Sequence, residues 1–216
     1  MKVAVLGAGA MGQVTIRDLV ESEKVTNVLI ADLDLLRAEK LKADLGNHSK
    51  VSCAQANVAD SGALATVLAG WGCVINCTPY YFNLNVMEAA LQAGCHYLDL
   101  GGLFHVTRKQ LELCGRFAAK DLLAIPGMGA APGLTNVMAA AAAAEMTTVE
   151  SIDIVAASVD LLASSHPFLP PYALDTILDE YFMEPYVFEG GQFQALKPMS
   201  GEAMLDFPEP VGKAAA

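Results

Sequence analysis

The chain has 216 residues, enough for one or two domains and for a core that needs neither disulfides nor metals. Its hydrophobic content of 54% argues against intrinsic disorder. Thirteen Lys and Arg against 24 Asp and Glu give a net charge of -11, which argues against nucleic acid or a membrane surface as a partner. The longest uncharged apolar run, Val137–Ala144, is too short to span a bilayer, and no signal peptide is expected.

The charge is unevenly distributed along the chain. Residues 1–125 carry 11 basic and 12 acidic side chains, a net of -1, and residues 126–216 carry 2 and 12, a net of -10. The acidic second part is either a solvated surface or a surface that favours a cationic ligand.

All five cysteines lie in the first 114 residues. Three of them sit in or beside apolar runs, where cysteine usually acts as a small buried hydrophobe. Their number is odd and no C-x-x-C pair occurs, so we expect no zinc site and place the protein in the reducing cytoplasm.

Apolar runs of strand length alternate with helical stretches over the first 125 residues. The predicted strands are 3–6, 28–30, 51–53, 73–75, 97–100 and 122–125. The predicted helices are 10–21, 34–45, 61–69, 84–93 and 106–119. Most of the strand runs are continuously apolar, as in strands covered on both faces. The alternation predicts an α/β fold, a Rossmann-type doubly wound parallel sheet with right-handed crossovers.

The pattern changes after residue 125. The expected elements are a loop at 126–133, a helix at 136–146, a strand at 151–155, a loop at 157–171, a helix at 172–182 and a β-hairpin at 185–196. We therefore predict a nucleotide-binding domain over 1–125. Residues 126–216 would begin a second, α+β domain for substrate binding and oligomerisation, which we expect to be incomplete here.

The strongest motif is G-x-G-x-x-G directly after the first strand and at the start of a helix, the context that dinucleotide binding requires. Its residues are Gly7, Ala8, Gly9, Ala10, Met11 and Gly12. Gly7 allows a tight turn, Gly9 lets a pyrophosphate approach the backbone, and Gly12 lets the helix pack on the sheet. The alternative is a glycine turn without a ligand.

Two acids follow the next strands. Asp32 comes 20 residues after Gly12, where a carboxylate binds the adenosine ribose and repels a 2'-phosphate, which favours NAD over NADP. Asp32 is alternatively a helix cap. Asp60 either flanks the adenine pocket or caps the following helix.

The segment after the fourth strand contains Asn76, Cys77, Thr78, Pro79 and Tyr80. Ligands of open parallel sheets bind at the carboxyl ends of the strands, so Cys77, Thr78 and Pro79 are expected beside the nicotinamide half of the cofactor. Tyr80, with the aromatic residues after it, either walls the ring or bridges to the second domain.

Asp99 ends the fifth strand and is followed by Gly101 and Gly102, which leave room for a ligand or allow a sharp turn. An acid, His105 and Arg108 close together suit an amino-acid substrate and proton transfer. His105 is alternatively a helix cap, and Arg108 a surface ion-pair partner.

The loop after the sixth strand, residues 127–136, again joins a strand to a helix through glycines. Its helix start, which includes Asn136, either holds a substrate carboxylate or belongs to an interdomain hinge.

These motifs resemble the saccharopine dehydrogenase superfamily, and within it the lysine 6-dehydrogenase group. The resemblance covers essentially the whole chain. It rests on residues 7–12, 76–83, 96–102 and 129–136, and the segment 99–111 looks most like the lysine 6-dehydrogenase branch. Two departures, Asn83 in place of a frequent histidine and Ala131 in place of aspartate, argue against saccharopine as substrate.

The resemblance implies an NAD-dependent oxidoreductase that deaminates the ε-amino group of L-lysine to the 6-semialdehyde, which cyclises. It also implies a homo-oligomer and an interdomain active site. From the residues we expect Asp99 or His105 to act as the base, and Arg108, Tyr80 and Asn136 to contact the substrate. A saccharopine- or carboxyspermidine-type enzyme using NAD(P), or a non-catalytic NAD-binding sensor module, are the alternatives.

Overall fold

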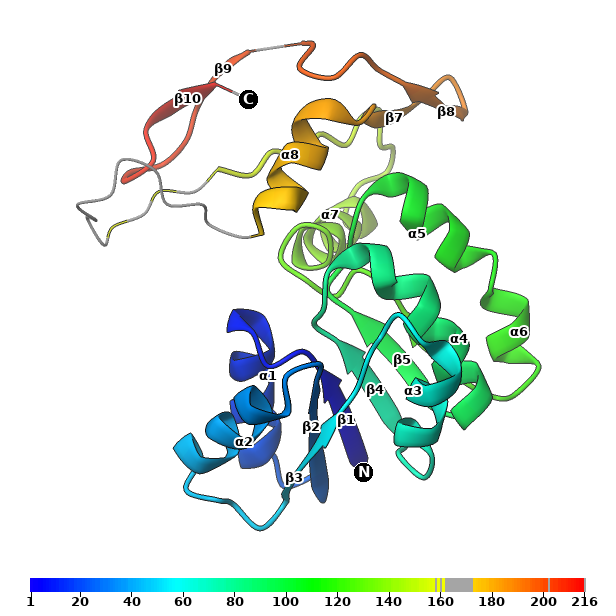
Figure 1. The fold of residues 1–216 in the computed structure, drawn as a ribbon. Helices are drawn as coiled ribbons and strands as arrows, with labels where there is room; N and C mark the ends of the chain where they lie inside the picture. The colour runs from blue at the N-terminus through cyan, green and yellow to red at the C-terminus, as the bar shows by residue number, and fades with distance from the viewer. Residues whose placement is uncertain (158, 160, 162–172, 202, 216) are drawn as a thin grey trace. The chain divides into compact units, whose positions relative to one another are not determined.

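The computed structural model describes residues 1–157, 159, 161, 173–201 and 203–215 (Figure 1). The chain divides into two compact units, Met1–Leu134 and Thr135–Ala216. The first unit contains the predicted nucleotide-binding domain and also the glycine- and proline-rich loop that follows residue 125.

The first unit is built on one six-stranded parallel sheet with the order β3-β2-β1-β4-β5-β6 (Figure 1). The strands are β1 Lys2–Leu6, β2 Asn27–Asp32, β3 Val51–Gln55, β4 Cys73–Asn76, β5 His96–Asp99 and β6 Ala124–Ile125. This order confirms the predicted doubly wound sheet. Strand order reverses between β1 and β4, so the crevice for a ligand opens at the carboxyl ends of these two strands.

Helices cover both faces of this sheet (Figure 1). They are α1 Ala10–Glu21, α2 Leu35–Asp44, α3 Ser61–Leu68, α4 Asn83–Ala93, α5 Phe104–Leu111 and α6 Cys114–Ala118, with a 3-10 turn, η1, at Tyr80–Phe82. Val3 and Val5 of β1 pack in one apolar cluster with α1 and α2. Ala4 and Leu6 pack in the other with α3 and α4, because successive strand residues face opposite sides. Burial on both faces explains why the strand runs are continuously apolar.

The predicted helix 106–119 is two helices, α5 and α6. Between them the Leu113 N–H donates to the Gln110 carbonyl, and the Arg116 N–H donates to the Leu113 carbonyl. These bonds span three residues, so they form tight turns in place of a continuous α-helix.

The second unit contains α7 and α8 and two antiparallel strand pairs. Their bounds are α7 Leu134–Ala144, α8 Leu174–Phe182, β7 Tyr186–Glu189, β8 Gln192–Ala195, β9 Met204–Asp206 and β10 Lys213–Ala215. The predicted hairpin is confirmed as β7 and β8, and the predicted helices correspond to α7 and α8. Most of the expected loop 157–171, and Tyr172, lie outside the described residues.

The predicted strand at 151–155 is wrong. Its residues have no regular secondary structure, because a strand needs a pairing partner and none of the described residues supplies one. None of the described residues of the second unit is buried. Among the residues that the structure describes, no helix combines the length and apolarity needed to cross a bilayer.

Candidate functional site

The glycine loop joins β1 to α1 and packs tightly at two of its three glycines. Gly7 has a positive φ of 91°, and a Cβ on Gly12 would collide with the Gly7 carbonyl oxygen. Nothing lies within 4 Å of a Cβ built on Gly9. Gly12 is therefore needed for packing, whereas the space beside Gly9 is open. Ala10 and Met11 are exposed in the first turn of α1, where N–H groups lack intrahelical acceptors.

A cavity of about 170 Å³ lies at the carboxyl ends of β1 to β4. It is lined by Gly7, Ala31, Asp32, Leu33, Ala56, Asn57, Val58, Thr78, Pro79 and Phe82. The fold thus brings together four of the predicted cofactor residues from separate segments: Gly7, Asp32, Thr78 and Pro79. A cavity at this switch point, next to a glycine loop and a helix N-terminus, suits a nucleotide.

Asp32 is buried at the end of β2, and its carboxylate is tied to the glycine loop. Oδ2 accepts the Ala8 N–H at 2.7 Å and Oδ1 accepts the Asp34 N–H at 2.9 Å. Asp34 is the residue that caps α2, through the Leu36 N–H at 3.0 Å. The capping role considered for Asp32 therefore belongs to Asp34, and Asp32 lines the cavity.

Asp60 is exposed and caps α3. Its Oδ1 accepts the Ala63 N–H at 2.9 Å. It is absent from the cavity lining, so of its two predicted roles the geometry supports the helix cap.

Cys77 packs behind the glycine loop. Its Sγ lies 3.8 Å from the Thr15 hydroxyl of α1, and burial raises the pKa of the thiol. Its carbonyl oxygen would lie 3.2 Å from a Cβ on Gly7. Cys77 therefore supports the loop from the α1 side, while its neighbours Thr78 and Pro79 face the cavity.

Asp99 is buried at the end of β5 and accepts four hydrogen bonds. Oδ1 accepts the N–H groups of Gly101 at 2.8 Å and Gly127 at 2.7 Å. Oδ2 accepts the Tyr97 hydroxyl at 2.7 Å and the Gln110 Nε2 at 2.6 Å. This carboxylate therefore joins two loops at the carboxyl edge of the sheet.

Tyr80 and His105 lie beside each other at this edge. Their ring centroids are 6.4 Å apart in an edge-to-face arrangement. Tyr80 is buried and His105 is half-buried. The N-cap of α5 is Leu103, without a side-chain cap bond, so His105 is not the cap. Arg108 is exposed, and its guanidinium lies 5.8 Å from the Phe104 ring centroid.

The space left by the two glycines after Asp99, Gly101 and Gly102, is occupied by other side chains of the protein. A Cβ on Gly101 would lie 2.6 Å from Pro132 Cγ, and one on Gly102 would lie 2.6 Å from Tyr80 Cβ. The loop 126–133 therefore packs directly on the loop 100–103. The predicted substrate residue Asn136 is exposed on α7, in the second unit.

Several cavity and network residues were not among the predicted site residues. Asn57 and Val58 follow β3, so the strand-end rule used for the other loops could have found them. Asn83 and Gln110 are buried on α4 and α5 and connect to Asp99 only through the tertiary fold. Within the described residues no cluster of three or more His, Cys, Asp or Glu forms a metal site.

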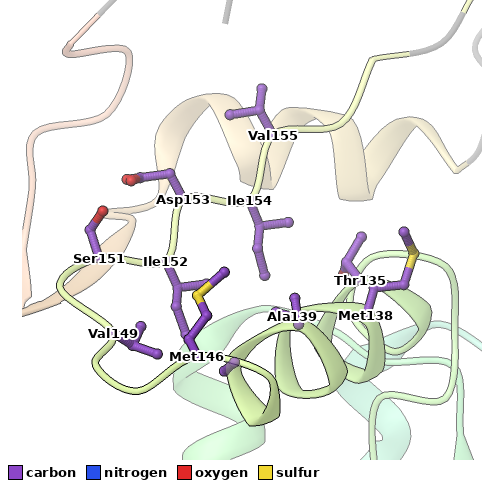
Figure 2. Close-up of a pocket in the computed structure, with 12 residues that line it drawn as sticks. Thr135, Met138, Ala139, Met146, Val149, Ser151, Ile152, Asp153, Ile154 and Val155 are labelled. Carbon is purple, nitrogen blue, oxygen red and sulfur yellow. The ribbon is translucent and has the colours of Figure 1, made fainter.

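A second hollow, of about 400 Å³, lies within the second unit between α7 and the segment 149–155 (Figure 2). Figure 2 shows Ile152 and Ile154 pointing toward α7 and Asp153 away from it. The lining of this hollow is mostly apolar. It includes Met138 of α7 and Met146, which follows the end of that helix. Residues 151–155 therefore have the alternation of a strand without strand pairing.

Residues 3–125 match the family described as the saccharopine dehydrogenase NADP-binding domain. The chain is 26% identical to the carboxyaminopropylagmatine dehydrogenase of Synechocystis sp., over 96% of this chain and 54% of that protein. It is 25% identical to the carboxynorspermidine synthase of Vibrio cholerae, over 97% of this chain and 55% of that protein. The chain thus spans about half the length of these curated relatives.

A solved structure of apo saccharopine dehydrogenase (L-Glu forming) from Saccharomyces cerevisiae has the same fold. The TM-score is 0.67 at 19% identity, over 97% of this chain and 47% of that chain. The match of the family model to residues 3–125 covers the parallel sheet from Val3 onward, together with its glycine loop. The chain therefore belongs to the saccharopine dehydrogenase NADP-binding domain family.

Proposed function

We propose that this chain is the nicotinamide-nucleotide-binding part of an oxidoreductase that acts at a carbon–nitrogen bond of an amino-acid-like or polyamine-like substrate. The observation that carries this proposal is the cavity in which Gly7, Asp32 and Thr78 meet at the switch point of the sheet. The family supplies the nucleotide class, and the names of the two curated relatives supply the class of substrate.

The residues present fit a dinucleotide. The open space beside Gly9 and the start of α1 would hold the pyrophosphate, and Asp32 has lone pairs left for ribose hydroxyls after its two bonds to the backbone. When bound, the nicotinamide supplies hydride transfer. We propose NAD as the cofactor, because a 2'-phosphate would meet the Asp32 carboxylate and the apolar, exposed Leu33. Arg37 and Lys40 line a neighbouring hollow of about 360 Å³ beside Gly9. If NADP were the cofactor, its 2'-phosphate would have to pair with these two cations.

As the substrate we propose L-lysine, on the resemblance of residues 99–111. The substrate ammonium, water and the oxidised nucleotide would together give the aldehyde, free ammonium, a proton and the reduced nucleotide. His105, half-buried against Tyr80, would accept the proton of the substrate ammonium, and Arg108 would bind the α-carboxylate. We also propose Asn136 as a substrate contact.

The relatives favour a second candidate, the reductive joining of an amine to a carbonyl compound that carries a carboxylate. Here a reduced nucleotide supplies hydride, water leaves and a secondary amine forms. Asn83 does not argue against this reaction, because it is buried and bonded to Asn76 and Gln110, out of reach of a substrate. One of the two departures that argued against saccharopine as substrate therefore no longer counts.

The test measures nucleotide absorbance in both directions, on this chain and on a longer product if the gene encodes one. NADH formation from lysine and NAD would support the first candidate. NADPH or NADH consumption that requires both an amine and an aldehyde would support the second. Tight nucleotide binding with no turnover in either direction would contradict both and favour a sensor module. Sedimentation of the same samples tests the expected homo-oligomer.

A further inference from the structure

A continuous chain of buried and partly buried hydrogen bonds connects the nucleotide cavity to the loops that follow β5 and β6. It begins at Thr78, whose N–H and hydroxyl both donate to Asn76 Oδ1 at 3.2 and 2.7 Å. Asn76 donates to Asn83 at 2.8 Å, Asn83 donates to Gln110 at 3.5 Å, and Gln110 donates to Asp99 at 2.6 Å. Asn76, Asn83, Gln110 and Asp99 are each about 1% exposed.

The sheet register creates this chain. Asn76 and Asp99 are paired residues at the ends of the adjacent parallel strands β4 and β5. Asn83 lies at the start of α4 and Gln110 in α5, so the two amides bridge the helices that cover this edge. Every link donates in the same direction, toward Asp99.

The direction of the chain is determined at both ends. At one end the Thr78 backbone N–H can only donate. At the other end all four partners of Asp99 are donors, which suits a carboxylate that has only acceptor oxygens. No amide in the chain can turn over without placing a donor against a donor.

Asp99 also holds the two loops that follow β5 and β6. Its Oδ1 accepts from Gly101 and Gly127, and its carbonyl oxygen accepts the Met128 N–H at 2.8 Å. Gly101 and Gly127 have positive φ values of 107° and 75°, backbone conformations that glycine adopts readily and other residues rarely. If Asp99 were the catalytic base, each proton that it accepted would weaken these contacts.

We propose that Asp99 is a positioning residue, which fixes the loops 100–103 and 126–129, and that Gln110 couples these loops to the nucleotide cavity through Asn83, Asn76 and Thr78. The coupling rests on the proposed function, because it assumes that a nucleotide contacts Thr78. Nucleotide binding then reduces the motion of both loops, although neither loop lines the cavity.

The first measurement is amide hydrogen exchange on the free protein. The amides of Gly101 and Gly127 should exchange at least about tenfold more slowly than the exposed amides of Gly190 and Gly191, because each donates to a buried carboxylate. Asp99→Ala should remove most of this protection, because it removes the oxygen that accepts both N–H groups. Gln110→Leu should leave it unchanged, since both bonds to Oδ1 remain. Equal exchange at the two glycine pairs in the wild type would overturn the positioning role without any variant.

The second measurement repeats the exchange with NADH, whose binding is followed separately by its fluorescence. NADH should slow exchange at Gly101 and Gly127 in the wild type. Gln110→Leu should bind NADH within about threefold of wild type and show no such slowing. Gln92→Leu, an exposed position on α4, is the matched control and should behave as the wild type.

The outcomes separate the two proposals. Slowing that persists in Gln110→Leu would overturn the coupling and leave nucleotide binding intact. Absence of both NADH and NADPH binding in the wild type would overturn the proposed function and the coupling together, and the exchange of the free protein would still decide the role of Asp99.

Discussion

The carboxylate of Asp32 accepts the backbone N–H of Ala8 at 2.7 Å, which ties the end of β2 to the glycine loop after β1. The acid is therefore positioned before any ligand arrives, with one oxygen on the loop and the other on the Asp34 N–H. Preorganisation of this kind lowers the entropic cost of binding.

Asp32→Asn should lower affinity for NADH about tenfold or more and narrow the difference between NADH and NADPH. The amide keeps the shape but loses the charge that binds ribose hydroxyls and repels a 2'-phosphate. Fluorescence titration with both nucleotides measures the change. Asp34→Asn, on the exposed cap of α2, is the control and should leave the preference unchanged; an equal shift in both variants would contradict the assignment.

Gly9→Ala and Gly12→Ala should separate ligand binding from packing. A Cβ at Gly9 meets no atom of the protein, so the variant should melt like the wild type and bind NADH at least about tenfold more weakly. A Cβ at Gly12 collides with the Gly7 carbonyl, so that variant should lose about 1–3 kcal/mol of stability. Denaturant unfolding and NADH titration measure both effects. Wild-type affinity for NADH in Gly9→Ala would contradict the proposed position of the pyrophosphate beside this loop.

Asp60→Ala should destabilise the protein by about 0.5–2 kcal/mol through loss of the α3 cap. Affinity for NADH should remain at the wild-type value, because Asp60 does not line the cavity. Asn57→Ala is the comparison, since Asn57 does line it and should weaken binding. A larger loss of NADH affinity in Asp60→Ala than in Asn57→Ala would instead support a role for Asp60 in the adenine pocket.

His105→Gln should lower kcat at least about tenfold with either candidate substrate and leave NADH affinity unchanged. The imidazole is half-buried and is the proton acceptor that we propose for the reaction, and it does not line the cavity at the switch point. Lys109→Gln, exposed on the same helix, is the control. Full activity in His105→Gln would assign the proton transfer to another group.

Protein stability should fall between about pH 9 and pH 11. Burial raises the pKa of the Cys73 and Cys95 thiols from 9.0 to about 11. As the pH rises, the unfolded chain therefore loses these protons before the folded chain does, and the free energy of unfolding falls. Melting temperatures across this range measure the effect. Cys95→Ala should flatten the decline, and an unchanged slope in that variant would contradict the assignment.

Much of the first unit could be predicted from local sequence patterns. The continuous apolar runs determine strands buried on both faces, and Val3 to Leu6 do pack alternately against the helices of the two faces. The glycine spacing and the position of Asp32 predicted the place of the cavity at the switch point, because turn geometry and strand-end placement depend on neighbouring residues.

Only the tertiary structure determined which donors surround Asp99 and that residues 151–155 do not form a strand. The four donors to Asp99 come from positions as far away as Gly127, and no pattern within β5 encodes them. Ile152 and Ile154 have the alternation of a strand, but pairing depends on another segment, which the described residues do not provide. Local periodicity thus determines which elements form, whereas the partners of a buried polar group or a strand edge are determined by segments distant in the chain.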